Sequence, residues 1–159
     1  MRKILIVSTL AAFLYACSGN SGKQETAADN KAADLMNDDA AAKEKKENRG
    51  IGKLTHVDIP EKLDEGLAKG GNGIFDLKCS ACHRLTNEKL VGPGWKDVTS
   101  RRKPEWIMNF ATNTDEMLNK DPEAQAMLEL CMVRMPNQSL SDDDARKVYE
   151  FMRKNDGVK

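Results

Sequence analysis

The spacing of apolar residues near the C-terminus follows helical periodicity. Apolar side chains at positions 145, 148, 149 and 152 have the i, i+3, i+4, i+7 spacing of a helix with one buried face. Ser141 suits the N-cap of this helix, and the three aspartates that follow it suit the positive end of the helix dipole. The pattern predicts a helix over residues 141–154.

Three further helices are predicted upstream, over residues 64–79, 104–111 and 121–132. Asp121 and Pro122 show the boundary signal, since aspartate caps helix N-termini and proline fits the first helical position. Glycine and proline predict a loop over residues 84–103, and scattered apolar residues predict an extended lead-in over residues 51–63. No segment alternates polar and apolar residues as a strand does, so the predicted fold class is all-α.

The N-terminus carries a targeting signal. A short basic start precedes an apolar run of 13 residues, from residue 4 to 16, which is too short for a typical membrane span and suits a signal peptide. The run ends in Leu14-Tyr15-Ala16-Cys17, which resembles a bacterial lipobox with an unusual tyrosine. The resemblance implies a signal peptide over residues 1–16 and a lipid anchor on Cys17. The alternative is an ordinary cleaved signal in which Cys17 is incidental.

Residues 18–50 contain no aromatic residue, and Leu35 and Met36 are their only large apolar ones. Such a segment cannot bury enough apolar surface to offset the entropy of ordering, so residues 17–50 are predicted to be a disordered tether and residues 51–159 the globular domain. A flexible chain of this length spans about 30–35 Å on average. Together the signals predict a protein anchored in the cell envelope and facing the periplasm, with the outer membrane favoured over the inner.

The composition limits the size of the core and the kinds of partner to be expected. Aromatic residues make up only 5% of the chain and charged residues 31%, so a core built from side chains alone would be thin. Something other than side chains is therefore expected to fill part of the domain. Lys and Arg number 25 and Asp and Glu also 25, which gives no reason to expect a nucleic-acid partner.

A Cys-x-x-Cys-His motif occupies residues 79–83, at the end of the first predicted helix. This spacing is typical of c-type haem attachment, in which Cys79 and Cys82 add to the two vinyl groups of one haem and His83 ligates the iron. A redox dithiol would be expected beside a βαβ pattern, which the sequence lacks. Half of a zinc site would need further Cys or His ligands, and only His56 and Cys131 remain in the domain.

Several motifs around these cysteines resemble the small class I cytochromes c of bacteria. Residues 71–75 (Gly-Asn-Gly-Ile-Phe) resemble a Gly-x-x-x-aromatic helix face, and residues 91–98 resemble a Gly-Pro loop. Met135-Pro136-Asn137, followed by Leu140-Ser141-Asp142, resembles the methionine loop and final helix. The resemblance implies the class I fold, with helices wrapped around one covalently attached haem c.

The resemblance also implies roles for single residues. The backbone carbonyl of Pro93 is expected to hold the ring nitrogen of His83 that does not face iron. Gly71 is expected to let the first and last helices approach closely, and Phe75 to pack against the last helix at Phe151.

The second axial ligand is expected to be Met135, which lies between two predicted helices in a segment stiffened by Pro136. Met117 in a predicted loop, Met132, and His56 for a bis-histidine haem remain as alternatives. Met108 and Met127 fall within predicted helices, where packing explains them.

Other residues near the motifs have weaker predicted roles. Cys131 is expected to be a small buried residue, with a reactive thiol or a dimer cross-link as the alternative. Trp95 or Trp106 would pack in the haem pocket, and either indole N–H would suit a propionate. The basic run 101–103 faces the propionates, a partner or only solvent.

The predicted function is one-electron transfer in a membrane-associated respiratory chain, by a protein expected to be a monomer. Ligation by His and Met fills both axial positions and disfavours substrate binding at iron. The expected partners are redox proteins, a donor and a terminal reductase or oxidase. A peroxidase-like enzyme and a gas-binding sensor are the alternatives if the methionine ligand is labile.

Overall fold

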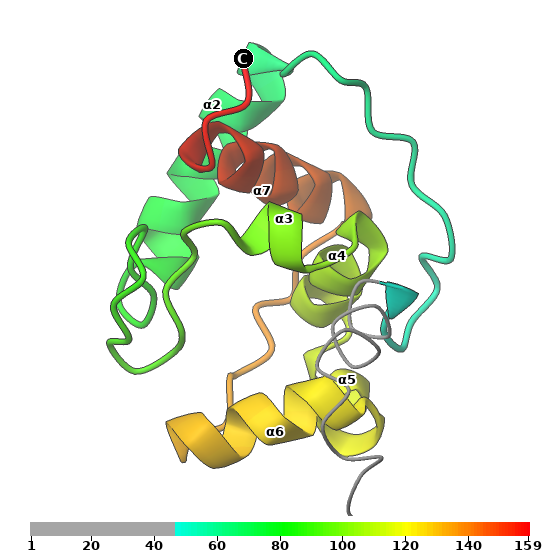
Figure 1. Ribbon diagram of the computed structural model, residues 1–159, viewed down its shortest axis with the longest axis vertical. Helices are drawn as coiled ribbons and strands as arrows, with labels where there is room; N and C mark the ends of the chain where they lie inside the picture. The colour runs from blue at the N-terminus through cyan, green and yellow to red at the C-terminus, as the bar shows by residue number, and fades with distance from the viewer. Residues whose placement is uncertain (1–46) are drawn as a thin grey trace, which may run out of the picture. The chain divides into compact units, whose positions relative to one another are not determined.

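The computed structural model describes residues 47–159 and contains only helices in that part of the chain (Figure 1). The elements are α2 (Glu65–Ile74), η2 (Phe75–Cys79), α3 (Val98–Arg101), α4 (Pro104–Thr112), α5 (Thr114–Lys120), α6 (Pro122–Cys131) and α7 (Asp142–Asn155). The predicted all-α class is confirmed. None of the helices in the described range is long and apolar enough to cross a membrane.

Three predictions made from the N-terminal sequence lie outside the described residues. They are the signal peptide, the lipidation of Cys17, and the disordered tether as far as residue 46.

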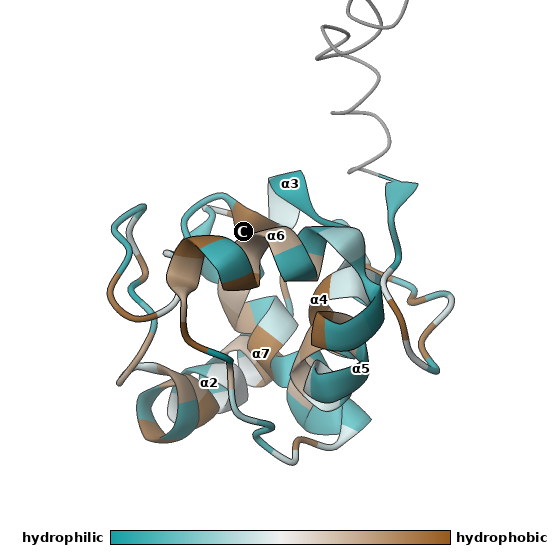
Figure 2. Ribbon diagram, turned by 90° about the horizontal axis from the view of Figure 1, so that it is seen from below, coloured by the Kyte–Doolittle hydropathy of each residue, from teal (hydrophilic) through white to brown (hydrophobic). Residues whose placement is uncertain are grey.

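Helices α2 and α7 pack against each other, although they lie at opposite ends of the domain sequence (Figure 1). Each begins at a side-chain cap, since the Asp64 side chain accepts a hydrogen bond from the N–H of Leu67 and the Ser141 side chain accepts one from the N–H of Asp144. Both α2 and α4 mix hydrophilic and hydrophobic residues along their length, as helices with one buried face do (Figure 2). The apolar faces of these helices therefore turn toward one another in the core.

Gly71 is the point of closest approach between these two helices. A Cβ at this position would lie 2.0 Å from the carbonyl oxygen of Lys147 and 2.8 Å from Cβ of Phe151. Next to this contact, the rings of Phe75 and Phe151 pack with their centroids 5.5 Å apart. Both contacts agree with the expectations for Gly71 and Phe75.

The first helix does not keep α-helical geometry to its end. From Phe75 to Cys79 it continues as the π-helix η2, and the N–H of Ser80 donates to the carbonyl of Phe75 at 2.9 Å. Short π-helical turns occur frequently at functional sites, because the wider turn changes the direction in which side chains point. Here the wider turn carries the chain into the first cysteine of the motif.

Two helices were not predicted. The four-residue α3 falls inside the predicted loop, and Asp156 holds it by accepting from the backbone N–H and the hydroxyl of Thr99. The segment around Met117 was predicted to be a loop but forms α5, where Met117 is fully buried. Neither helix has a side-chain cap, so no start signal marks them in the sequence, and tertiary contacts decide the structure.

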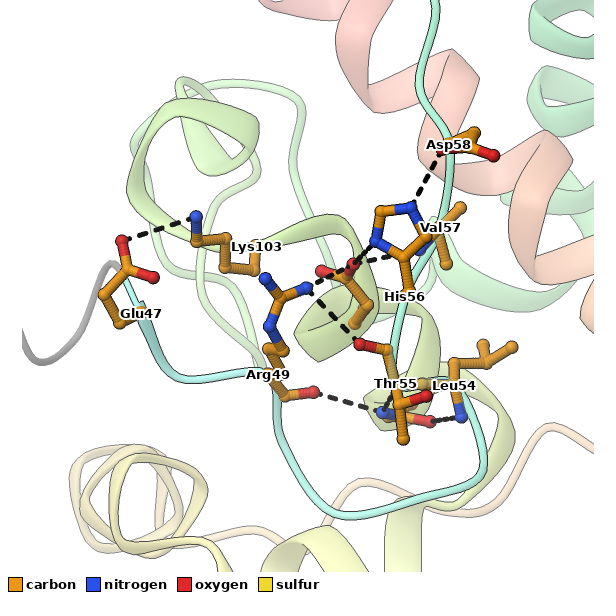
Figure 3. A network of polar contacts seen from close by, with 10 residues as sticks. Glu47, Arg49, Leu54, Thr55, His56, Val57, Asp58 and Lys103 are labelled. Carbon is orange, nitrogen blue, oxygen red and sulfur yellow. Dashed lines mark hydrogen bonds and ion pairs between the residues drawn. The ribbon is translucent and has the colours of Figure 1, made fainter.

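The lead-in forms an extended strap over residues 48–60, which is held mainly by two buried side chains of α4 (Figure 3). Glu105 accepts hydrogen bonds from the Arg49 guanidinium at 2.7 Å and from the N–H of Val57 at 2.9 Å. Asn109 donates to the carbonyls of Arg49 and Leu54 and accepts from the N–H of Leu54. Residues 48–50, assigned to the tether from sequence, lie against the domain, because Arg49 bonds to these two side chains of α4 and Asn48 donates to Asp121.

A buried ionic group joins the end of the strap to α7. Glu150 is fully buried and accepts from the N–H of Asp64 and from the side chains of Arg146 and Arg153. Arg153 also donates to the carbonyls of Pro60 and Glu61. Burial alone would raise the pKa of Glu150, but these hydrogen bonds outweigh it and lower the pKa.

The crossing at Gly71 leads to a stability prediction. The Gly71→Ala variant is expected to lower the free energy of unfolding by about 1–3 kcal/mol, because the added methyl must separate two packed helices. Gly73→Ala is the matched control, since nothing lies within 4 Å of a Cβ there and alanine favours a helix over glycine by about 1 kcal/mol. Guanidinium unfolding followed by circular dichroism measures both. Equal stability of the two variants would contradict the packing argument.

Candidate cofactor site

One large cavity lies beside the Cys-x-x-Cys-His motif. Its empty space, part of it open to solvent, is about 1220 Å³. Both motif cysteines and His83 line the cavity, as do Pro93 and Met135. Its other lining side chains are largely apolar and include Trp95, Ile107, Phe110, Leu128, Val148 and Met152.

The motif residues are placed by a tight turn that follows η2. The carbonyl of Cys79 accepts from the N–H of Cys82 at 3.0 Å and from the N–H of His83 at 2.9 Å. Cys79 is buried and Cys82 is half-buried, and neither forms a disulfide with a described residue. Burial raises the pKa of the Cys79 thiol to about 11, although the charge of Lys78 acts in the opposite direction. The turn thus presents two thiols and one imidazole to the same cavity.

The imidazole of His83 is held from one side by the backbone. Its Nδ1 lies 2.9 Å from the carbonyl oxygen of Pro93, so Nδ1 donates and Nε2 keeps its lone pair. Burial lowers the pKa of His83, partly offset by the Pro93 hydrogen bond, and this favours the neutral ring that a metal ligand requires. The expected hydrogen bond between these two residues is therefore present.

Gly92 is a functional residue that the sequence reasoning did not single out. A Cβ there would lie 2.5 Å from Cε1 and 2.9 Å from Nδ1 of His83, so the ring packs directly on the backbone. The N–H of Gly92 also donates to the carbonyl of Cys82 at 2.9 Å. The only signal for this contact in the sequence was that Gly92 directly precedes Pro93.

The structure separates the candidate methionine ligands. Met135 is half-buried and lines the cavity from the segment between α6 and α7. Met127, which sequence reasoning assigned to packing, also lines it from α6. Met117 does not, because it is buried elsewhere with its sulfur 2.9 Å from the N–H of Ile51. Met132 ends α6 with a side chain that is 85% exposed, away from the cavity lining.

His56 is also outside the cavity lining. Its ring is largely exposed and pairs with the carboxylate of Asp58 at 2.9 Å (Figure 3). The strap therefore holds His56 away from the residues that line the cavity.

The two tryptophans both line the cavity, but they differ in whether the indole N–H already has a hydrogen-bond partner. The indole N–H of Trp106 donates to Asp121 at 3.2 Å, and the Arg102 guanidinium lies over its ring, 4.7 Å from the centroid. Trp95 packs between Phe75 and His83, with centroid distances of 4.9 and 5.4 Å. Trp106 is thus committed to Asp121.

Further polar groups complete the wall. Arg101 and Arg102 both line the cavity, and Arg102 is paired with Glu123. Burial lowers the pKa of Arg102, and the neighbouring Arg101 adds to this effect.

Cys131, expected to be buried, is instead half-buried at the end of α6, because its side chain lines the cavity.

These residues fit a flat apolar group that carries a metal. Two thiols can attach such a group, an oriented neutral imidazole and a thioether can ligate its metal, and the walls are mainly apolar. A zinc site does not fit as well, since the described residues contain no cluster of three or more His, Cys, Asp or Glu suited to a metal ion.

Comparisons with known proteins agree with this geometry. The sequence model of the family described as Cytochrome c matches residues 68–156. A solved structure, cytochrome c from Rhodothermus marinus, is 33% identical with a TM-score of 0.65, and the match covers 68% of this chain and 92% of that one. No match was found among the curated proteins.

Two engineered forms of the same cytochrome are also similar. One, named Rma TDE, has a TM-score of 0.63, and the other, the same protein bound to a carbene intermediate, has a TM-score of 0.60. Each is 33% identical to this chain, and each match covers 66% of this chain and 90% of the other.

The contact between Gly92 and His83 leads to a second prediction. The Gly92→Ala variant is expected to displace the imidazole from the Pro93 carbonyl, which changes the visible spectrum of the haem protein and lowers its unfolding free energy by about 1–3 kcal/mol. Pro93→Ala is the control, because it keeps the backbone carbonyl and is expected to keep the spectrum. An unchanged spectrum in Gly92→Ala would show that the ring position does not depend on this glycine.

Proposed function

Because the chain belongs to the cytochrome c family and carries a haem c attached through Cys79 and Cys82, we propose that it is a one-electron carrier whose iron is ligated by His83 and Met135. The haem supplies a reversible one-electron change between Fe(III) and Fe(II). The observation that carries the proposal is that an oriented, neutral imidazole and a thioether line the same apolar cavity as the two thiols.

His83 serves the proposed function through its fixed orientation. The Pro93 carbonyl accepts a hydrogen bond from the N–H at Nδ1, which leaves the lone pair of Nε2 free to ligate, while Gly92 packs against the ring. A ligand that hardly moves between redox states keeps the reorganisation on electron transfer small. A hydrogen bond to the distal ring nitrogen also raises the basicity of the imidazole.

Met135 is proposed as the second ligand in preference to Met127. Met135 lies in a segment without secondary structure, from which its side chain can adjust to the iron, whereas Met127 is fixed within α6. A methionine ligand raises the haem potential relative to bis-histidine ligation. With both axial positions filled, the protein favours electron transfer over binding of a substrate at iron.

Trp95 is proposed to donate its indole N–H to a haem propionate, since Trp106 already donates to Asp121. Arg101 supplies a positive charge at the same wall, held in place by the carbonyls of Lys96 and Asp97. A positive charge beside a carboxylate favours its ionised form, so the proposed role of Arg101 is to keep the propionates ionised.

The proposed setting is a respiratory chain at a membrane. The lipobox-like end of the signal peptide supports a lipid anchor on Cys17 and a periplasmic location. The partners proposed are a redox donor and a terminal reductase or oxidase, and the protein is proposed to act as a monomer.

A second candidate function is chemistry or gas binding at iron after Met135 has left it. The observation that favours it is the similarity to an engineered cytochrome bound to a carbene intermediate. Carbon monoxide added to the reduced protein separates the two functions. A spectrum that carbon monoxide leaves unchanged supports the carrier, and ready binding supports the second candidate.

The methionine assignment gives a third prediction. In Met135→Ala the charge-transfer band of methionine-ligated ferric haem is expected to disappear and the midpoint potential to fall, because the thioether ligand is lost. Met132→Leu and Met117→Leu are controls that should keep the band. Met127→Leu tests another methionine that lines the cavity, and loss of the band in that variant alone would move the assignment to Met127.

The anchor gives a fourth prediction. Protein purified from the membranes of a bacterial host is expected to carry acyl chains on Cys17, visible by mass spectrometry of the N-terminal peptide, and Cys17→Ser is expected to lack them. Cys131→Ser is the matched control and should keep the acyl mass. A wild-type N-terminus without acyl chains would exclude the lipoprotein form.

A further inference from the structure

The segment that carries Met135 has little backbone support. Among the described residues, positions 133–140 take part in no backbone-to-backbone hydrogen bond. The two bonds within the segment are local, from Gln138 to the carbonyl of Pro136 and from the N–H of Ser139 to Asn137. Ser139 also has a φ of 52°, which is unfavourable for a residue with a side chain. Something else must hold this segment over the cavity.

Three cationic side chains connect the segment and the adjoining end of α6 to other parts of the domain. Lys78 of η2 donates to the carbonyl of Gln138 at 3.0 Å. Lys89, from the loop after the motif, donates to the carbonyl of Leu130 at 2.8 Å. Arg134 donates to the Asp115 carboxylate at 3.2 Å and to Asn119 at 3.0 Å, both on α5.

These contacts lie on two sides of the segment. The two lysines come from either side of the Cys-x-x-Cys-His motif, and Arg134 reaches the helix that follows α4. All of them are exposed. Two are hydrogen bonds from a lysine to a backbone carbonyl, and the third, between Arg134 and Asp115, is an ion pair, which is weak at the surface and is screened by salt. Met135 and Leu140 also pack against the core, but a segment whose polar contacts are all exposed opens more readily than one held by a buried hydrogen-bond ladder.

We propose that Lys78, Lys89 and Arg134 are positioning residues that hold residues 132–140 over the cavity and so set how often Met135 leaves the iron. The inference rests on the proposed ligation by His83 and Met135. An external ligand binds only the open state, so its apparent affinity rises in proportion to the population of that state. The exchange replaces the thioether by another donor and involves no redox change.

Imidazole is a suitable probe, because its unprotonated form carries no charge and the loss of a cation does not alter its attraction to the site. It is titrated into the oxidised haem protein while the methionine charge-transfer band is followed. The variants Lys78→Gln, Lys89→Gln and Arg134→Gln are each expected to raise the affinity for imidazole about two- to fivefold. The triple variant is expected to raise it on the order of tenfold or more, if the contacts act independently.

Two controls separate positioning from general stability. Lys62→Gln removes an exposed lysine that forms no ion pair or hydrogen bond with the described residues, and it should leave the affinity unchanged. Lys78→Arg keeps a cationic donor and should restore nearly wild-type affinity. A merely structural role would lower the melting temperature without changing imidazole binding.

Salt provides an independent measurement on the wild-type protein, which does not depend on any variant folding. Imidazole affinity is expected to rise with salt in the wild-type protein and to rise much less in Arg134→Gln, where the ion pair is already absent.

The outcomes distinguish this inference from the proposed ligation. If the wild-type protein lacks the methionine band, or if Met135→Ala keeps it, both the ligation and the positioning role are overturned. If the ligation holds but the three variants bind imidazole no more tightly than wild type and Lys62→Gln, only the positioning role is overturned.

Discussion

The close crossing of α2 and α7 at Gly71 is the contact on which the rest of the domain depends. Because the two backbones nearly touch there, α2 has one direction in which to continue, and η2 carries that direction to Cys79. The same crossing brings Phe75 against Phe151 and so forms one wall of the core beside the cavity. The position of the attachment cysteines therefore follows from a helix contact more than one turn away from them.

The two proposed ligands are held by different physics. His83 is positioned by backbone atoms close to it in the sequence, namely the Pro93 carbonyl and the Gly92 backbone. The segment that carries Met135 is linked to η2 through the bond from Lys78 to Gln138 and to α5 through Arg134, both across long sequence separations. A ligand fixed by local backbone is hard to displace, whereas one fixed by exposed side chains responds to its environment. The cofactor would thus have one axial ligand that is rigidly held and one whose position can adjust.

Much of the fold and site could be predicted from the sequence, because the signals were local. The Cys79–His83 motif, the Asp121 and Ser141 caps and the glycine at 71 each act within a few residues. Helices α3 and α5 could not be predicted, since contacts with distant residues hold them and no cap marks them. For the same reason, sequence spacing could not distinguish Met117, buried against the strap, from Met127, which reaches the cavity.

The strap has a mechanical consequence. The strap precedes α2 in the chain and is bonded to α4. Glu105 binds Arg49 and Val57, and Asn109 binds Leu54. Tension applied through the chain before residue 47 would load these bonds first, and the helices that carry the cysteines would be shielded from it. The strap therefore protects the geometry of the cofactor site from force applied to the chain that precedes it.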